Sequence, residues 1–441
     1  MKPLLIALTL LAVLQYVGAQ VAFVPAVTYR VDSEPCSIIA INVNGDDKLD
    51  LICANYGTNT LSVLTNNGSG SFALAFSLNV GNGPQSVTDF DINGDGRADL
   101  VCANGFDNTL SVLTNNGNGN FATSATYAVG SVPKMVLPAD INNDSKLDLI
   151  CANAGFHNLT VVTNNGSGSF HLASSPNVGT TPWSVVAADV NNDGKPDLIS
   201  ANYNGNSLSI LNNNGNGGFT LASSPTLVGS PTSVIAADVK GDGKFDLICA
   251  DGFNNRLVVM TNNASGIFTT AASYSVGGYP QCVIAADING DGKPDLISAN
   301  ASGNTLSILT NDGSGGFALA STLSVGSWPV SVVAADVNGD GKLDLICANY
   351  IDNTLSVLLN VSIFPQPTFT PTLTIEPYNN SVIVLWPSAS AGWSLQQNSD
   401  LTSSNWSPSG YDGYGIADDE TNKSLTITPS TGNLFFRLLH P

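Results

Sequence analysis

A motif repeated at a constant spacing constrains the fold of this chain more than any other sequence feature. The stretch DINGDGRADL covers residues 91–100, and related strings recur so that seven copies lie 49 residues apart. A proline keeps the same period from Pro35 to Pro329. A fixed period of this length is typical of solenoids, propellers and other repeat arrays. The first positions of the seven acidic stretches are Asn42, Asp91, Asp140, Asp189, Asp238, Asp287 and Asp336.

Each copy is predicted to form four antiparallel strands, which we name A to D in chain order. In the copy at residues 84–130, QSVTDFDI precedes the acidic loop, and DLVCAN follows it as a continuous apolar run. TLSVLTNN then alternates as a strand should, GNGN is a hairpin signal, and FATSATYAVG is the fourth strand. No window has helical periodicity. Four strands every 40–50 residues are typical of a β-propeller blade, so the fold class is all-β.

The two ends of the repeat array complete each other. The seventh copy stops after its third strand, near Asn360, whereas AFVPAVTYRVD at residues 22–32 aligns with the fourth strand of the other copies. This N-terminal strand is predicted to complete the last blade and leave no open edge. Residues 21–362 are therefore predicted to form one seven-bladed β-propeller.

The acidic A–B loops have the pattern Asp-x-Asn-x-Asp-Gly-x-x-Asp. Oxygens at positions 1, 3, 5 and 9, with a main-chain carbonyl at position 7, suit calcium, which takes six to eight oxygen ligands. The loops are not EF-hands, because position 12 lies in a strand and is not Glu. The alternative is a solvated acidic turn held by Asx hydrogen bonds. The predicted ligands are Asn42, Asn44, Asp46 and Asp50; Asp91, Asn93, Asp95 and Asp99; Asp140, Asn142, Asp144 and Asp148; Asp189, Asn191, Asp193 and Asp197; Asp238, Asp242 and Asp246; Asp287, Asn289, Asp291 and Asp295; and Asp336, Asn338, Asp340 and Asp344.

The seven loops are not equivalent. Loop 5 has Lys240 at position 3, where an ammonium cannot ligate a cation, so this loop is expected to be empty or weakest. Loop 1 begins with the neutral Asn42 and has Asp47 in place of the turn glycine, and loop 3 has Ser145 there. Loops 2, 4, 6 and 7 match the full pattern.

The string DINGDGRADLVCAN and its copies closely resemble the FG-GAP/VCBS-type repeats of integrin-like β-propellers. The resemblance covers about 340 residues. It implies a seven-bladed propeller with calcium in the A–B loops, on the face opposite the usual ligand site. It implies no single activity, because such repeats occur in adhesion proteins, lectins, surface proteins and accessory modules of enzymes.

The segments outside the repeats predict export and a second domain. Residues 1–19 have a positive end, a short apolar core and a small-residue cleavage site, as a signal peptide does. The alternative, a membrane anchor, needs a longer apolar run. Residues 363–372 are a Pro/Thr-rich linker, and 373–441 are predicted to form a small β-sandwich that resembles a C-terminal module common in exported bacterial proteins. Its Trp386, Trp393 and Trp406 are either core or a sugar platform. We expect a secreted or cell-surface monomer with no span after signal removal.

Composition argues against several classes of function. The chain has net charge -20 and no cluster of Lys and Arg, so nucleic acid is not an expected partner. The three histidines are far apart in the repeat, so no zinc cluster or Ser-His-Asp set is visible. Five of the seven cysteines share one repeat position, where blade spacing is too wide for disulfides. We expect unpaired thiols and no enzyme.

Aromatic residues gather in loops that share the face opposite the A–B loops. The D–A loops carry Trp183, Tyr279 and Trp328, and the B–C loops carry Phe106 and Phe253 as well as three tyrosines. Rings beside amide side chains favour a glycan or an extracellular protein as ligand. One alternative is that these rings only pack the loops together in a structural cell-surface scaffold. Another is that the propeller is the accessory or catalytic part of a polysaccharide-active enzyme. The predicted ligand-binding residues are Trp183, Tyr279, Trp328, Tyr56, Tyr203 and Tyr350.

Overall fold

A computed structural model describes residues 21–362 apart from 228, 264 and 265, and seven strands of the region after residue 373. The predicted signal peptide and linker lie outside the described residues. The chain divides into two compact units, Met1–Phe364 and Pro365–Pro441, with the division inside the predicted linker. In the described part of the chain, no helix is long and apolar enough to cross a membrane.

The first unit is a ring of seven four-stranded antiparallel sheets, which confirms the predicted propeller. Blade 1 consists of β2 (Pro35–Ile41), β3 (Asp50–Asn55), β4 (Thr60–Asn66) and β5 (Phe72–Asn79). Blade 2 consists of β6 (Pro84–Phe90), β7 (Asp99–Asn104), β8 (Thr109–Asn115) and β9 (Phe121–Ala128). Blade 3 consists of β10 (Pro133–Ala139), β11 (Asp148–Asn153), β12 (Asn158–Asn164) and β13 (Phe170–Ser174). Blade 4 consists of β14 (Pro182–Ala188), β15 (Asp197–Asn202), β16 (Ser207–Asn213) and β17 (Phe219–Ser223).

The remaining blades follow the same order. Blade 5 consists of β18 (Pro231–Ala237), β19 (Asp246–Asp251), β20 (Arg256–Asn262) and β21 (Phe268–Ser275). Blade 6 consists of β22 (Pro280–Ala286), β23 (Asp295–Asn300), β24 (Thr305–Asn311) and β25 (Phe317–Ser324). Blade 7 consists of β26 (Pro329–Ala335), β27 (Asp344–Asn349), β28 (Thr354–Leu358) and β1 (Val27–Arg30).

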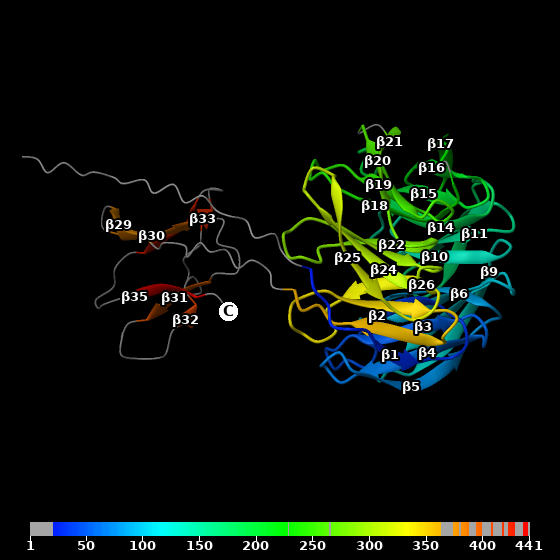
Figure 1. Ribbon diagram of the computed structural model, residues 1–441, viewed down its shortest axis with the longest axis horizontal. Coiled ribbons are helices and arrows are strands. Elements are labelled where there is room, and N and C mark those ends of the chain that lie inside the picture. Colours follow the sequence, from blue (N-terminus) through cyan, green and yellow to red (C-terminus); the bar gives the residue numbers. More distant parts are fainter. Residues whose placement is uncertain are drawn as a thin grey trace, which may run out of the picture. The chain divides into compact units, whose positions relative to one another are not determined.

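The N-terminal strand closes the ring, as predicted. Strand β1 pairs antiparallel with β28, from Val27 opposite Val357 to Arg30 opposite Thr354 (Figure 1). The innermost A strands pack against one another around the axis, and β2 of blade 1 packs against β26 of blade 7. The ring is therefore closed between blade 7 and blade 1.

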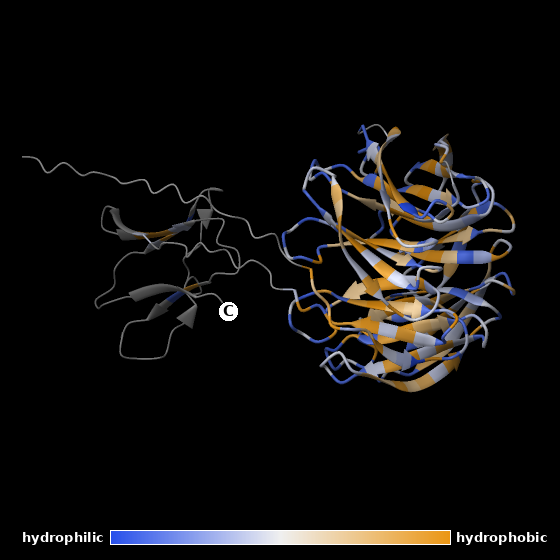
Figure 2. Cartoon of the chain, in the orientation of Figure 1, coloured by the Kyte–Doolittle hydropathy of each residue, from blue (hydrophilic) through white to orange (hydrophobic). Residues whose placement is uncertain are grey.

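The hydrophobic core lies between the blades. Every residue of strand B is buried in each blade, for example Leu100 and Val101 in blade 2. Its side chains pack alternately against the preceding and the following blade, which explains why this strand is apolar on both faces. Figure 2 shows hydrophobic residues along the strands and hydrophilic residues in many of the loops. All seven cysteines are free thiols, as predicted.

The second unit contains two sheets. One consists of β29 (Thr374–Tyr378), β30 (Ser381–Pro387), β34 (Asn422–Ile427) and β33 (Ala417–Asp418). The other consists of β32 (Ser407–Pro408), β31 (Ser394–Asn398) and β35 (Phe435–Leu439). Trp386 is only 3% exposed, which places it in the core and not on a sugar platform. Trp393 and Trp406 lie outside the described residues, and the sandwich packing stays a prediction.

Candidate functional site

The A–B loops are built from side chains that accept main-chain hydrogen bonds within the loop. In loop 2, Asp91 accepts the N–H groups of Gly94 and Gly96, both at 2.8 Å. Asn93 accepts the N–H of Asp95 at 2.9 Å. Such Asx turns explain why Asp and Asn recur at positions 1, 3 and 5. Asp47 and Ser145, at the turn position where other loops have glycine, adopt positive φ of 62° and 65°.

The aspartate at position 9 ties each loop to the blade. Asp99 is fully buried and accepts the N–H of Ile92 at 3.3 Å and that of Asn115 at 2.7 Å. The Asn115 amide in turn donates to the Val43 carbonyl of blade 1 at 3.0 Å. The same bond recurs around the ring, including from Asn66 to Val337 across the closure. Burial raises the pKa of the position 9 carboxyls, to about 6 in Asp148, Asp295 and Asp344.

The donor set of the loops fits a hard cation, although the side chains do not converge on one. Within the described residues, no three His, Cys, Asp or Glu side chains come close enough together to hold a metal ion. The position 5 carboxylates instead pair with a basic residue at position 7, as Asp46 does with Lys48 at 3.4 Å. Carboxylate and amide oxygens at four positions remain the ligand types that calcium prefers.

Loop 5 contains a cation of its own. The Lys240 ammonium lies 3.2 Å from Asp242 Oδ2 and 3.5 Å from Asp246 Oδ1. It therefore stands between the carboxylates of positions 5 and 9, where the other loops have only an asparagine at position 3. The carboxylate oxygens of positions 5 and 9 can thus contact the same positive charge, and in loop 5 this charge is the ammonium of Lys240.

The opposite end of the axis has a cavity of about 250 Å³, which we call the mouth. Seven of its lining residues occupy one repeat position, directly after the repeated proline. In every blade this residue lies in a β-bulge, where the pairing of strands A and B shifts register. A bulge leaves one residue unpaired and redirects its side chain. The lining residues are Cys36, Gln85, Lys134, Trp183, Thr232, Gln281 and Val330, together with Trp328 and Tyr350.

Five of the six predicted ligand-binding residues form one arc of contacts at this end of the propeller. Trp183 stacks on Tyr203, with ring centroids 3.8 Å apart and planes 3° apart. The Tyr203 hydroxyl is 2.7 Å from that of Tyr279, whose ring lies 6.1 Å from Trp328. The Tyr350 N–H donates to the Trp328 carbonyl at 3.0 Å. Three of these residues, Trp183, Trp328 and Tyr350, line the mouth, and Tyr203 and Tyr279 connect Trp183 to Trp328.

The sixth residue, Tyr56, lies beyond the arc and pairs with Phe106 at 5.2 Å. Its N–H donates to the Glu34 carbonyl at 2.9 Å. Burial, together with a hydrogen bond to the Glu34 side chain, raises the pKa of the Tyr350 hydroxyl. Glu34 thus connects Tyr56 to the end of the arc.

The residue before the repeated proline holds a strained backbone conformation. Val132, Thr181, Tyr279 and Trp328 have φ between 54° and 62°. This left-handed region costs an L-residue about 1–2 kcal/mol, and β-branched side chains are rare there. The conformation is held from the preceding blade, because the Trp328 N–H donates to Asn304 Oδ1 at 2.9 Å. Strain of this kind clusters at functional sites.

The polar side chains of the mouth differ in their hydrogen-bond partners. The Cys36 thiol donates to the Pro84 carbonyl at 3.0 Å, and burial raises its pKa to about 12, so it is not a thiolate at neutral pH. The Thr232 hydroxyl donates to the Pro280 carbonyl at 2.7 Å. The Lys134 ammonium donates to Gln85 Oε1 at 3.2 Å and lies 5.5 Å from the Trp183 ring centre. No histidine or carboxylate lines this cavity.

Several residues of this face were not predicted. Phe156 and Ile351 are 66% and 59% exposed in their B–C loops, like Phe106 and Phe253. The bulge residues Gln85, Lys134, Thr232, Gln281 and Val330 were not predicted as a set either. A sequence signal could have identified them. Their repeat position follows a constant proline and precedes a residue that is mostly serine, yet the residue at this position differs in almost every copy.

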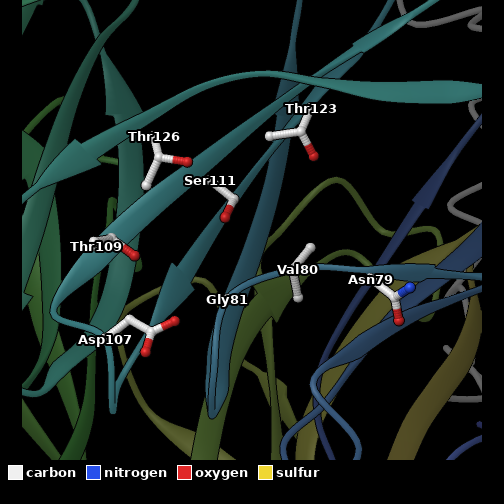
Figure 3. A pocket seen from close by; sticks show the side chains of 8 residues that line it. All are labelled: Asn79, Val80, Gly81, Asp107, Thr109, Ser111, Thr123 and Thr126. Carbon is white, nitrogen blue, oxygen red and sulfur yellow. The ribbon is translucent and has the colours of Figure 1, made fainter.

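A second cavity, of about 500 Å³, lies between blades 1 and 2 (Figure 3). Hydroxyl groups line it, from Thr109, Ser111, Thr123 and Thr126. The one carboxylate among the lining residues is that of Asp107. It accepts hydrogen bonds from the main-chain N–H of Asn82 at 2.7 Å and from the Asn82 side-chain amide at 2.9 Å, and both bonds lower the pKa of Asp107. The lining residues of this second cavity include no aromatic ring and no basic group. The cavity therefore has fewer groups than the mouth that could bind a ligand.

The fold and the loops define a repeat β-propeller with acidic A–B loops. The family of FG-GAP-like repeats matches residues 42–102, 91–151, 140–200, 189–249, 238–298 and 287–347. These matches span more than half of the chain, and the chain belongs to this family. No curated protein sequence matches it.

Solved structures resemble the propeller. A crystal structure of BBS1N in complex with ARL6DN, soaked with lead, has a TM-score of 0.58 and 12% sequence identity, and the match covers 79% of this chain and 99% of that chain. The same complex soaked with mercury also has a TM-score of 0.58 and 12% identity, and covers 78% and 98%. At this identity the likeness concerns the fold alone.

Proposed function

We propose that this chain is an exported binding module whose ligand docks at the mouth, and that calcium stabilises the A–B loops at the other end. The observation that carries the proposal is the variation among the seven bulge residues on otherwise similar blades. Identical blades offer identical weak sites, whereas different side chains around one cavity make a single specific site. The strained backbone of Trp328 and Tyr279 beside this cavity supports the same conclusion.

A glycan is the ligand class that the lining residues favour. Trp183 and Trp328 provide aromatic surface for the apolar face of a sugar ring, and Gln85 and Gln281 provide amides for its hydroxyl groups. Sites of this kind combine apolar walls with a few placed polar groups. The cavity volume of about 250 Å³ suits one sugar residue at a time.

A protein partner is the second candidate, favoured by the rim around the mouth. Phe106, Phe156, Phe253 and Ile351 are between 59% and 75% exposed in the B–C loops. Exposed apolar side chains gathered on one face are typical of protein interaction surfaces. A ligand that used the rim would bury more surface than the mouth alone provides.

Calcium would have a structural role away from the mouth. Asp and Asn oxygens of the A–B loops would hold it, and the ion would neutralise carboxylates that lie within one turn of each other. In loop 5 the Lys240 ammonium already supplies positive charge to Asp242 and Asp246. This arrangement supports a cation as the partner of the same oxygens in the other loops.

Removal of one ring tests the binding site. Trp328→Gly deletes the indole and also relieves its positive φ, since Gly83 occupies the same position in blade 2. We expect at least a tenfold loss of affinity for any glycan found on an array of immobilised glycans, with the melting temperature retained. Val132→Gly makes the same backbone change in blade 3 without loss of a ring and serves as the control. Unchanged binding by Trp328→Gly would remove the mouth as the ligand site.

A further inference from the structure

We propose that the ligand recognised at the mouth is an acidic sugar residue, such as a uronic acid, whose carboxylate pairs with the Lys134 ammonium. The inference rests on the proposed function of the mouth as a glycan site and adds the chemical class of the glycan. It follows from a basic group without a charge partner inside a cavity that has no acidic side chain.

Lys134 differs from the other basic side chains of the propeller. Within the described residues, each of the others forms an ion pair with an aspartate, except Arg30, which is exposed on β1. The Lys134 ammonium instead contacts the neutral Gln85 amide and the Trp183 ring. Burial lowers the pKa of Lys134 because it removes water from the charged form. An ammonium that is withdrawn from water and lacks a counter-charge is costly, and a bound anion supplies the missing partner.

The lining of the mouth excludes acids although the chain is rich in them. The sequence has 34 Asp and Glu residues and net charge -20, yet none of the nine lining residues is acidic. Glu34 is the acidic residue nearest in sequence to the lining residue Cys36, and its side chain is hydrogen-bonded to the Tyr350 hydroxyl. A carboxylate entering the mouth therefore meets no fixed negative charge in the lining, whereas the A–B loops at the far end are strongly acidic.

Hydrogen-bond donors dominate the groups that remain uncommitted in the mouth. The ammonium of Lys134 has three N–H groups and uses one of them on Gln85. The Gln281 amide and the Trp328 indole make no side-chain hydrogen bond in the described part of the chain. Donors in excess of acceptors favour a ligand that carries acceptor oxygens, and a carboxylate accepts from several donors at once.

The ring geometry places Trp328 and Tyr350 across the mouth from Lys134, whereas Trp183 lies beside it. Lys134 belongs to blade 3, and Trp328 and Tyr350 belong to blade 7, with blades 1 and 2 between them on one side and blades 4 to 6 on the other. A sugar ring between them can rest an apolar face on Trp328 and direct its carboxylate to Lys134. An acidic peptide offers the carboxylate but no flat ring for the indole, so the sugar fits better.

Calorimetric titration of the full chain tests the inference. The probes are a tetramer of galacturonic acid, the same tetramer with its carboxyl groups methyl-esterified, and a tetramer of aspartic acid. We expect the acid tetramer to bind at least tenfold tighter than the ester, because the ester lacks the charge that strengthens a hydrogen bond from an ammonium. Lys134→Gln should remove that preference and keep the fold, because glutamine occupies this position in blades 2 and 6. Arg30→Gln removes the same charge from an exposed strand and should change nothing.

The outcomes separate the inference from the function on which it rests. Equal binding of the acid and the ester, unaffected by Lys134→Gln, would leave a glycan site and refute the acidic ligand. Tighter binding of the aspartate tetramer that depends on Lys134 would also refute it, in favour of a protein ligand. Binding of no saccharide, acid or neutral, on an array or in titration would count against the glycan function itself.

Discussion

At the scale of single residues, the repeats reveal which polar groups lack partners. The asparagine that ends strand B donates to strand C in each of blades 1 to 3, but the Oδ1 atoms of Asn55, Asn104 and Asn153 accept no hydrogen bond. Two residues earlier these blades have cysteine. In blade 4 the corresponding residue is Ser200, whose hydroxyl donates to Asn202 Oδ1 at 3.0 Å. The cysteines of blades 1 to 3 therefore leave this Oδ1 atom without a donor, whereas in blade 7 the Cys347 thiol donates to Asn349 Oδ1 at 3.5 Å.

Replacement of these cysteines by serine should stabilise the propeller. A new buried hydrogen bond in each of Cys53→Ser, Cys102→Ser and Cys151→Ser is expected to raise the free energy of unfolding by about 0.5–1 kcal/mol. Thermal and denaturant melts measure the change. Cys249→Ser is the matched control, because its neighbour Asp251 already pairs with Arg256 at 2.9 Å and needs no donor. An equal gain in the control would contradict the explanation.

The strained residue before the proline gives a second prediction. Val132 is β-branched and has φ of 54°, whereas Gly83 holds the same place in blade 2 without strain. Val132→Gly should raise the free energy of unfolding by about 1 kcal/mol, after the entropy lost by glycine is subtracted. Val132→Ala keeps the positive φ with a Cβ and should not give this gain. Denaturant titration of both variants decides between relief of strain and simple truncation of a side chain.

At the scale of elements, loop 5 can be converted to the common pattern. Lys240→Asn removes the ammonium from between Asp242 and Asp246 and restores the position 3 amide. We expect one more calcium bound per chain, with lower stability than the native protein in EDTA and equal or higher stability in excess calcium. Equilibrium dialysis with atomic absorption counts the ions. An unchanged count would show that loop 5 is not a latent member of the set.

The sequence predicts the elements better than the site, for a physical reason. The 49-residue period and the apolar B strands predict seven blades, because these patterns reflect burial that all copies share. The N-terminal strand, which has no partner within its own repeat, predicts the closure of the ring. The mouth depends on a bulge and a positive φ beside each proline, and neither is encoded in hydrophobic periodicity. That Lys134 has no acidic neighbour depends on which blades face each other across the axis, which requires the closed ring.

At the scale of the whole molecule, calcium is expected to act on all loops together. Each strand C asparagine bonds to the A–B loop of the preceding blade, so the loops form one connected ring. A ligand at 100 times its dissociation constant stabilises the folded state by about 2.7 kcal/mol per site. Melts in excess calcium and in EDTA should therefore differ by many degrees and keep a single transition. Identical melting temperatures would refute calcium binding.

The closure of blade 7 by β1 has a consequence for synthesis and folding. The strand that seals the ring is made early and finds its partner, β28, only when the last repeat has emerged. Until then the growing chain has two open edges, and contacts of such long sequence separation form slowly. Every chain carries the same β1 and the same open edge of β28. In a concentrated solution, β1 of one chain can therefore pair with β28 of another chain, which joins the rings into strand-exchanged oligomers. Slow, dilute folding conditions should therefore favour closure of each ring by its own N-terminal strand over exchange of this strand between chains.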